Sequence, residues 1–344
     1  MDRVSKDRRL PDALANYGLV ADIGGTNIRF GVVDLAADVL VLAPASFPAV
    51  GQAGVVEAAR AYLASLGLGT APSAAVLAVA GPPRDGALNL TNSKLHISSR
   101  ELRDALGIGS VRLINDFEAI ALSVPLLVPE DWRAIGDVPA PPRLARETVA
   151  IVGPGTGFGV AGFVRVGETA VPLAGEGGHV SFAPVDALEV QILQALTKRF
   201  GRVSVERLLS GPGLRSLHAA LAGIEGVTAP DLSPAEIAEQ AEADPTSLCY
   251  RVFALFCGVL GSVAGDVALT LGARDGVLIA GGIMPAHAAF FARSAFRARF
   301  EAKGRFVDYM KAIPTRLIVQ TWSGLIGAAS LLAGGAQRPG GAVD

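Results

Sequence analysis

Two glycine-rich stretches of this sequence have the residue types that bind phosphate groups. In the first, ADIGGTN, Asp22 is followed by Gly24, Gly25, Thr26 and Asn27. Glycines let backbone N–H groups approach an anion because no Cβ stands in the way, and the threonine hydroxyl adds a donor. Because the Asp22 carboxylate would repel a phosphate, we expect it to hold Mg²⁺ through water. Taken alone, the stretch is equally well explained as a hairpin turn with a capping aspartate.

The second stretch, GPGTGFG, spans residues 153–159 and has Gly155, Thr156 and Gly157 at its tip. It fails the dinucleotide-binding pattern G-x-G-x-x-G because Val160 stands three residues beyond Gly157. No lysine completes a Walker A loop. One such loop is a weak signal, but two glycine–threonine turns from two halves of a protein could hold a polyphosphate from both sides.

The segment LINDFEA places Asn115 and Asp116 directly after an apolar run that is typical of a buried strand. Ligands of α/β proteins bind beyond the carboxyl ends of such strands. An aspartate there could accept the proton of a hydroxyl that attacks a phosphoryl group, which requires a positioned base rather than a strong one. An Asn-Asp pair is also a good helix N-cap, and both roles can hold at once.

Two further segments carry polar side chains on glycine-rich loops. GEGGHVSFAP presents Glu176 and His179 among three glycines, which preclude a regular helix and suit hydrogen bonding to a polyol. In ERLLSGPGL we expect Glu206 to lie on a short helix that ends at residues 210–213. By itself, Glu206 is best explained as an ordinary solvated glutamate.

The segment LIAGGIMP is predicted to be a buried strand that leads into Gly281 and Gly282. A glycine pair at this place would admit an adenine or a ribose against bare backbone. It is equally well explained as a tight strand-to-helix turn.

The elements that position these residues follow from hydrophobic periodicity, and the same layout is predicted twice. Strands at 19–23 and 28–34 form one glycine-turned hairpin, and strands at 148–152 and 159–164 form a second. We interpret residues 125–147 as a long connection between the two halves. Further strands are expected at 74–79, 111–114, 169–172, 276–280 and 318–321, and helices at 55–66, 100–106, 188–200, 205–208, 234–241, 252–271 and 323–333.

The composition favours a well-packed, ordered chain in a reducing compartment. The 344 residues are 51% hydrophobic and 18% charged, and the net charge of −2 gives no reason to expect nucleic acid or an anionic membrane as partner. Cys249 and Cys257 match no zinc or disulfide spacing, so the cytoplasm is expected. Residues 1–17 lack the apolar core of a secretion signal, and the run at 252–265 is too short to span a membrane.

Together, these motifs and their order resemble the bacterial glucokinases of the proteobacterial type, in the actin-like sugar kinase superfamily. The matching blocks run from Gly18 to about Ala333 and are ADIGGTN, LTN, LINDFEA, GPGTGFG, GEGGHVSFAP, ERLLSGPGL, LIAGGIMP and FEAKGRF. The resemblance implies a kinase that transfers a phosphoryl group from ATP, with Mg²⁺, to O6 of D-glucose in the first step of glycolysis. It also implies a homodimer.

The resemblance assigns a role to each of the candidate residues. Asp116 matches the general base, and the residues that match sugar-binding positions are Asn92 (in LTN), Asn115, Asp116, Glu176, His179 and Glu206. It therefore overrules the interpretation of Glu206 as a solvated glutamate. The residues that match ATP-binding positions are Asp22, Gly24, Gly25, Thr26, Asn27, Gly155, Thr156, Gly157, Gly281 and Gly282.

The fold that the resemblance implies is α/β, the two-domain actin-like (ribonuclease H-like) sugar kinase fold with an interdomain cleft. The small domain is expected to comprise residues 18–126 and 321–344, and the large domain residues 127–320. We expect residues 1–17 to form a flexible N-terminal extension with no assigned function. Closure of the two domains on the sugar would expel water that could otherwise attack ATP.

Three alternatives remain open on the sequence alone. A kinase for mannose, glucosamine or an N-acetylated hexose would keep the same motifs, because no residue near C2 of the sugar can be identified. A non-catalytic ATP-binding regulator on the same fold predicts a missing base, whereas Asp116, Glu176 and His179 are all present. A dinucleotide dehydrogenase is more distant because the required glycine spacing fails.

Overall fold

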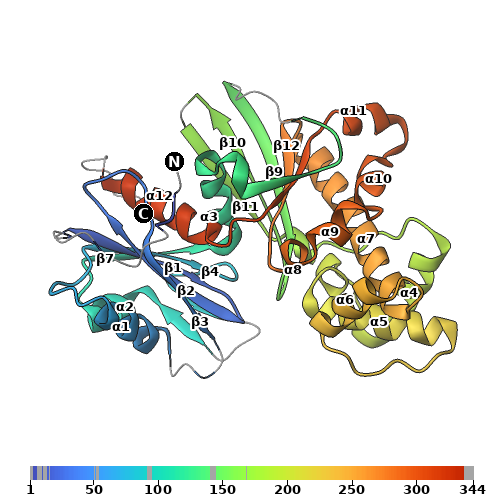
Figure 1. The fold of residues 1–344 in the computed structure, drawn as a ribbon, viewed down its shortest axis with the longest axis horizontal. Helices are drawn as coiled ribbons and strands as arrows, with labels where there is room; N and C mark the ends of the chain where they lie inside the picture. The colour runs from blue at the N-terminus through green and yellow to red at the C-terminus, as the bar shows by residue number, and fades with distance from the viewer. Residues whose placement is uncertain are drawn as a thin grey trace. The chain divides into compact units, whose positions relative to one another are not determined.

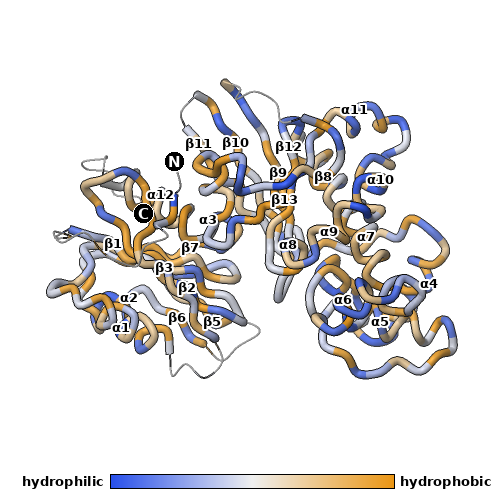
Figure 2. Tube along the Cα trace, viewed as in Figure 1, coloured by the Kyte–Doolittle hydropathy of each residue, from blue (hydrophilic) through white to orange (hydrophobic). Residues whose placement is uncertain are grey.

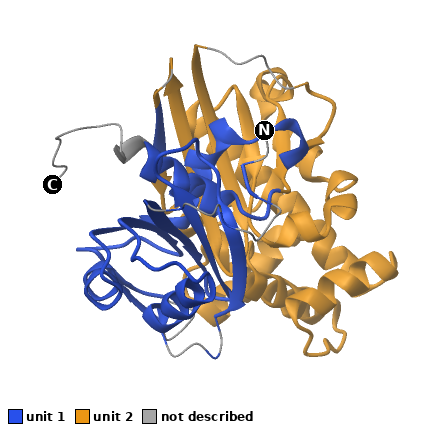
Figure 3. Cartoon of the chain, turned by 60° about the vertical axis from the view of Figure 1, so that its left-hand side comes forward, with its two compact units in different colours: residues 1–131, 170–172, 320–344 blue, residues 132–169, 173–319 orange. Residues whose placement is uncertain are grey.

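The chain divides into two compact units in the computed structural model, which describes residues 3–5, 10, 14, 16–49, 51, 54–90, 95–139, 145–167 and 169–336, with side chains up to 333. Unit 1 comprises Met1–Asp131, Ala170–Pro172 and Gln320–Asp344, and unit 2 comprises Trp132–Thr169 and Leu173–Val319 (Figure 3). Apart from Ala170–Pro172, the chain passes from unit 1 to unit 2 after Asp131 and returns after Val319, whereas the boundaries expected between the two domains were 126/127 and 320/321.

Unit 1 is built on a five-stranded sheet with the strand order β3-β2-β1-β4-β7. Its first three strands form an antiparallel meander, and β4 and β7 are then added parallel to β1. The strands are β1 (Tyr17–Ile23), β2 (Asn27–Asp34), β3 (Leu42–Pro48), β4 (Ala74–Val79) and β7 (Ser110–Asn115), with β5 (Ala87–Asn89) and β6 (His96–Ser98) as a separate pair. Its α-helices are α1 (Val55–Ser65), α2 (Ser99–Leu106), α3 (Asp116–Ser123) and α12 (Ser323–Ala336) (Figure 1).

Unit 2 repeats this layout in a six-stranded sheet with the order β11-β10-β9-β12-β13-β8. A glycine-turned antiparallel pair, β9 (Arg146–Pro154) and β10 (Phe158–Val166), is again followed by strands that run parallel to its first member. The others are β11 (Thr169–Gly175, of which Ala170–Pro172 are grouped with unit 1), β12 (Gly276–Ile279), β13 (Thr315–Ile318) and β8 (Trp132–Ile135). The shared strand order confirms the predicted duplication, which the loose likeness of the two glycine hairpins first indicated.

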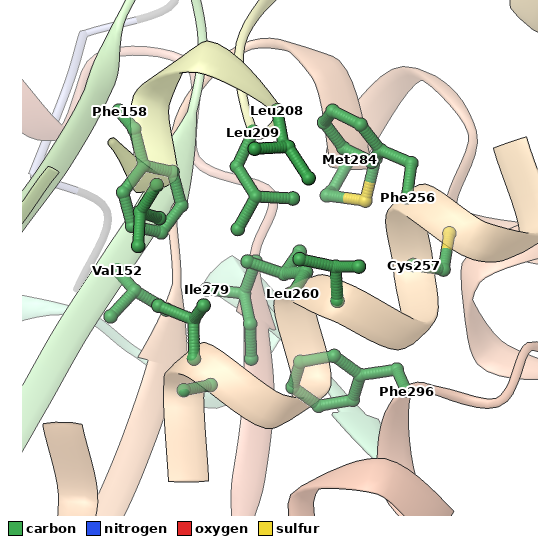
Figure 4. Close-up of a cluster of buried hydrophobic side chains, with 14 of the residues drawn as sticks. Val152, Phe158, Leu208, Leu209, Phe256, Cys257, Leu260, Ile279, Met284 and Phe296 are labelled. Carbon is green, nitrogen blue, oxygen red and sulfur yellow. The ribbon is translucent and has the colours of Figure 1, made fainter. Parts of the chain in front are cut away.

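Helices pack around the sheet of unit 2 and enclose its hydrophobic core. Figure 4 shows part of this core, where Val152 of β9, Ile279 of β12 and Leu260 of α7 meet. The α-helices of this unit are α4 (Ala187–Phe200), α5 (Gly211–Glu225), α6 (Pro234–Ala243), α7 (Leu248–Leu271), α8 (Ile283–Ala286), α9 (Ala288–Ala292), α10 (Phe296–Glu301) and α11 (Val307–Lys311). Short 3₁₀ turns are η1 (Val124–Leu126), η2 (Pro129–Asp131), η3 (Gly177–His179), η4 (Val205–Arg207) and η5 (Gly304–Phe306).

Helix α7 is the core helix of unit 2. Its 24 residues make it long and apolar enough to cross a membrane by length and composition. Most of its apolar stretch is nevertheless buried against the rest of the unit, and the tube in Figure 2 is largely orange along this helix. The helix begins at Leu248, earlier than the expected Val252, because the Ser247 side chain accepts a hydrogen bond from the Tyr250 N–H and caps it.

The structure corrects three local predictions. The segment 125–147 is more than a connection, since it contains β8, a short strand that pairs antiparallel with β13. The strand expected at 318–321 lies earlier, as β13 at Thr315–Ile318. The glycines and proline at 210–213 begin helix α5 rather than end a helix, because Ser210 caps the Gly213 N–H and proline fits the first turn.

Part of the N-terminal segment is hydrogen-bonded to the rest of unit 1. The Ser5 N–H donates to the Val41 carbonyl and the Val41 N–H donates to the Arg3 carbonyl, at 2.8 and 2.9 Å. Tyr17 already belongs to β1, and its hydroxyl donates to the Thr70 carbonyl. The boundary expected between residues 17 and 18 therefore falls inside a strand.

Candidate active site

In unit 1, the glycine turn and Asp116 lie at the same edge of the sheet. The parallel register aligns Ile23, the last residue of β1, with Val79 of β4, and Val79 in turn with Asn115 of β7. All three strands therefore end in one row, which is where α/β sheets bind ligands. Strand β4 alone separates β1 from β7, so these two strands lie about 10 Å apart, or two strand spacings.

The first glycine turn connects β1 to β2 and leaves its polar residues accessible. The Gly24 N–H donates to the Asn27 carbonyl at 2.9 Å and closes the turn, while the Ala49 N–H donates to the Thr26 carbonyl at 2.9 Å. Thr26 and Asn27 are exposed at its tip, and Gly24 and Gly25 are partly exposed. The turn thus presents glycine backbone together with a hydroxyl and an amide side chain.

Asp22 is held from two sides. Its Oδ2 atom lies 2.9 Å from Nη1 of Arg29, the residue directly opposite on β2. Its carboxyl group also packs against Gly324, where an added Cβ would stand 2.9 Å from the Asp22 Cγ atom. Gly324 lies in the first turn of α12, and the positive end of a helix favours a carboxylate.

Asn115 and Asp116 form the start of helix α3. Oδ1 of Asn115 accepts from the N–H groups of Phe117 and Glu118, at 2.9 and 3.2 Å, which confirms the predicted cap. The cap engages only the oxygen, so the side-chain NH₂ group of Asn115 brings two further donors to this edge. Oδ1 of Asp116 accepts from the Phe117 N–H at 2.9 Å, which fixes the side chain at the first helical position.

Helix α12 supports both acidic residues of this edge. It packs on α3 at Gly327, where an added Cβ would collide with the carbonyl oxygen of Ala119. The same helix meets Asp22 through Gly324. Two small residues on α12 thus allow it to lie against the helix that carries Asp116 and against the strand that carries Asp22. Asn92, the remaining predicted sugar residue of this unit, lies outside the described residues.

In unit 2, the second glycine loop connects β9 to β10 and is held by α5. The Gly155 N–H donates to the Gly157 carbonyl at 2.8 Å, and the Gly211 N–H of α5 donates to the Gly155 carbonyl at 2.9 Å. Thr156 is exposed at the tip.

Gly281 and Gly282 lie directly beside this loop. Gly281 has a φ of +84° and packs so closely on the Pro154 carbonyl that a Cβ would collide with it. In return, a Cβ on Gly153 would stand 2.5 Å from the Ala280 carbonyl oxygen. The backbones of the two segments are therefore in direct contact where β9 and β12 end, and glycine is required at both Gly153 and Gly281.

Glu176 and His179 lie together on the loop after β11. Nε2 of His179 is 3.9 Å from Oε2 of Glu176, and both side chains are more than half exposed. The loop is seated on β10, because a Cβ on Gly178 would collide with the Phe158 carbonyl oxygen and one on Gly177 with the Val160 side chain. These glycines bring the two polar side chains next to the second glycine loop.

Glu206 reaches the same place from the 3₁₀ turn η4. Its Oε2 atom accepts from the Phe158 N–H at 2.9 Å, which the sequence did not indicate because 48 positions separate the two residues. Arg202 was also missed. Its Nη2 atom donates to the His179 carbonyl at 2.6 Å and so holds the loop from behind.

Each unit thus gathers its own share of the predicted site residues. Unit 1 places Asp22 and the first glycine turn on the edge that also carries Asn115 and Asp116. Unit 2 places the second glycine loop beside Gly281 and Gly282. It also brings three polar side chains close to the start of β10, namely Glu176, His179 and Glu206. Within the described parts of the chain, no three acidic, histidine or cysteine side chains cluster as metal ligands.

Comparison with known proteins agrees with the sequence motifs. A family model described as glucokinase matches residues 19–334. A glucokinase from Caulobacter sp. strain K31 is 49% identical over 314 residues, which cover 91% of this chain and 94% of that protein.

Solved structures agree as well. A glucokinase from an Antarctic psychrotroph superposes with a TM-score of 0.78 at 36% identity, covering 93% of this chain and 99% of that one. A glucokinase from Balamuthia mandrillaris, solved in complex with glucose, has a TM-score of 0.77 at 22% identity over 92% of this chain and 93% of that one. These neighbours confirm the expected fold class.

Proposed function

Because the chain belongs to the glucokinase family, it is an enzyme that phosphorylates glucose with ATP, and we propose that Asp116 is its general base. The observation that carries this proposal is the row of strand ends that aligns the first glycine turn with Asn115. Asp116 follows at the first position of α3, with its carboxylate oriented by the Phe117 N–H. An aspartate so fixed can accept the proton of the sugar O6 hydroxyl as that oxygen attacks the γ-phosphorus atom.

The sugar hydroxyls are proposed to bind Asn115, Glu176, His179 and Glu206, with Asn92 as a further contact. These side chains supply both acceptors and donors, as recognition of a polyol requires. The support for this assignment is that unit 2 collects Glu176, His179 and Glu206 around Phe158, and that the sequence motifs match residue by residue.

The phosphates of ATP are proposed to bind the two glycine loops, with Gly281 and Gly282 beside the rest of the nucleotide. The first loop contributes Gly24, Gly25, Thr26 and Asn27, and the second contributes Gly155, Thr156 and Gly157. Backbone N–H groups that are already in place stabilise the charge that develops during in-line transfer. Accordingly, we propose that units 1 and 2 are the small and large domains.

The residues around Asp22 fit a Mg²⁺ ion only if the ion contacts the carboxylate through water. Arg29 already neutralises the Asp22 carboxylate, and no cluster of three ligands exists in the described residues. This donor set suits an ion that is held mainly by phosphate oxygens and water, with Asp22 in contact through water. When bound, Mg²⁺ would neutralise charge on the transferring phosphoryl group.

We further propose a cytoplasmic homodimer that acts in the first step of glycolysis. The family resemblance supports this assignment, and the two free, buried cysteines suit a reducing compartment.

Measuring ADP release with ATP and Mg²⁺ on a panel of hexoses tests the proposed function. The panel comprises glucose, mannose, fructose, glucosamine and N-acetylglucosamine. We expect strong turnover on glucose, with the others weak. Turnover on a different sugar alone would overturn the sugar assignment of Glu176, His179 and Glu206, and ATP binding without turnover on any sugar would favour a regulator.

A further inference from the structure

The segment from Val203 through η4 to the start of α5 contacts both the glycine loop and the loop of His179 in unit 2. On one side it is bonded to the loop of His179, because the Val205 N–H donates to the Val180 carbonyl at 2.9 Å and the Phe182 N–H donates to the Val203 carbonyl at 3.1 Å. On the other side it holds the glycine loop at both ends.

The two attachments to the glycine loop are one side chain and one backbone group. The Glu206 carboxylate accepts from the Phe158 N–H, at the exit of the loop. The Gly211 N–H donates to the Gly155 carbonyl, at its entrance. Between these two points, the Ser210 hydroxyl donates to the Glu206 carbonyl at 2.8 Å and keeps η4 and α5 in a fixed relation.

Gly157, at the tip of the glycine loop, leaves room for the Glu206 carboxylate. A Cβ on Gly157 would stand 2.5 Å from Oε2 of Glu206, so the absence of a side chain lets the carboxylate reach Phe158. The Phe158 ring is meanwhile fixed in the core with Leu208 and Leu209, which directly follow η4 (Figure 4). The geometry of the glycine loop therefore depends on Glu206. The Phe158 ring, which anchors the loop in the core, packs against Leu208 and Leu209 of the same segment.

We propose that Glu206 positions the phosphate-binding loop and thereby couples sugar binding to nucleotide binding. A carboxylate has two oxygens, so one can hold the Phe158 N–H while the other accepts from a sugar hydroxyl. A bound sugar then restricts Glu206, and through it the backbone of residues 155–158. The positioning of the loop stands on the structure alone, while the coupling rests on the proposed function.

Amide hydrogen exchange in the ligand-free protein tests the positioning role. Glu206→Ala removes the acceptor, so we expect faster exchange in peptides that cover residues 153–159. Glu206→Gln retains an oxygen that can accept from Phe158 and should restore most of the protection. Wild-type exchange in Glu206→Ala would overturn the proposal, whatever the enzyme does with sugars.

Nucleotide affinity in the absence of sugar provides a second measurement. With a non-hydrolysable ATP analogue and calorimetry, we expect Glu206→Ala to raise the Kd about five- to tenfold, which is the effect of one hydrogen bond. His179→Asn is the matched control, because this side chain belongs to the sugar loop and has no bond to the glycine loop among the described contacts. It should weaken glucose binding and leave the sugar-free nucleotide Kd unchanged. An unchanged nucleotide Kd in Glu206→Ala would contradict the proposal.

Gly157→Ala approaches the same contact from the opposite side and keeps the proposal testable if Glu206→Ala fails to fold. Its φ is not positive, so alanine fits the backbone, but its Cβ displaces the carboxylate. We expect the effects of the two substitutions on the nucleotide Kd to be non-additive, since each breaks the same contact.

The coupling between sugar and nucleotide is measured as the factor by which glucose changes the nucleotide Kd. This factor should fall toward one in both variants, and a wild-type factor in both would exclude coupling through Glu206.

Discussion

Asp22 and Arg29 face each other directly across the β1–β2 hairpin and form an ion pair of 2.9 Å between Oδ2 and Nη1. This relationship explains how a carboxylate can stand beside a turn that is proposed to hold phosphates. The guanidinium group offsets the negative charge of Asp22, and the start of α12 contributes further positive potential through its N–H groups. The charge of Asp22 is therefore balanced before any ion or nucleotide arrives.

Removal of Arg29 is expected to weaken nucleotide binding. In Arg29→Ala, Asp22 keeps its charge without its partner, so it repels the phosphates and the KM for Mg·ATP should rise about fivefold, or about 1 kcal/mol. The KM for glucose should change little. Steady-state kinetics at several free Mg²⁺ concentrations would measure both. Arg103→Ala, which breaks an exposed pair with Asp104 in the same unit, is the control, and equal effects of the two substitutions would contradict a local role for Arg29.

Asp116→Asn should abolish most turnover while glucose still binds. The amide can accept the Phe117 hydrogen bond that orients the native carboxylate, but it cannot take a proton from the sugar hydroxyl. We expect kcat to fall by about 10²-fold or more, with the glucose Kd from calorimetry within a few-fold of wild type. Glu118→Gln, on the same helix, should retain activity. A near-normal kcat in Asp116→Asn would remove Asp116 from the role of base.

Gly327→Ala should destabilise unit 1 and lower activity together. The new Cβ would collide with the Ala119 carbonyl, so α12 must move away from α3. Overpacking of this kind costs about 1–3 kcal/mol, which corresponds to a loss of a few degrees in Tm. Because α3 carries Asp116 at its first position, kcat should fall as well.

A second glycine-to-alanine substitution separates packing from backbone effects. Gly223 lies in α5, and a Cβ there meets nothing within 4 Å. Gly223→Ala should therefore be neutral or stabilise by up to about 1 kcal/mol through helix propensity. Equal Tm values for Gly327→Ala and wild type would show that α12 does not need the close approach at Ala119.

Stability should fall on acidification partly through His218. This histidine is 3% exposed and packs near Cys249, and burial lowers the pKa of its imidazole. Because the unfolded chain binds a proton more readily, the stabilisation is complete above the ordinary pKa near 6.5 and is lost as the pH falls from there toward the folded pKa. We expect the free energy of unfolding of wild type to drop more between pH 7.5 and 5.5 than that of His218→Gln. His96→Gln, at an exposed position, is the control, and parallel curves for wild type and His218→Gln would refute the assignment.

Many local features of this protein were predictable from its sequence, although the helix start at Ser210 was not. The glycine turns, the buried strand at Ala74–Val79 and the cap at Asn115 all depend on residues within a few positions of one another. Short-range hydrogen bonds and hydrophobic alternation encode such features directly. The order of the motifs along the chain was sufficient to identify the family and hence the activity.

The relations between distant segments were decided only by the tertiary structure. Strand β8 exists because it pairs with β13, nearly the length of unit 2 away, and its four residues show no strand signal alone. The family resemblance assigned Glu206 to the sugar, but only the fold showed that its carboxylate accepts from the Phe158 N–H. The need for glycine at 327 likewise comes from a carbonyl on another helix. Such contacts depend on how the sheets and helices pack, and the neighbouring residues in the sequence carry no signal for that packing.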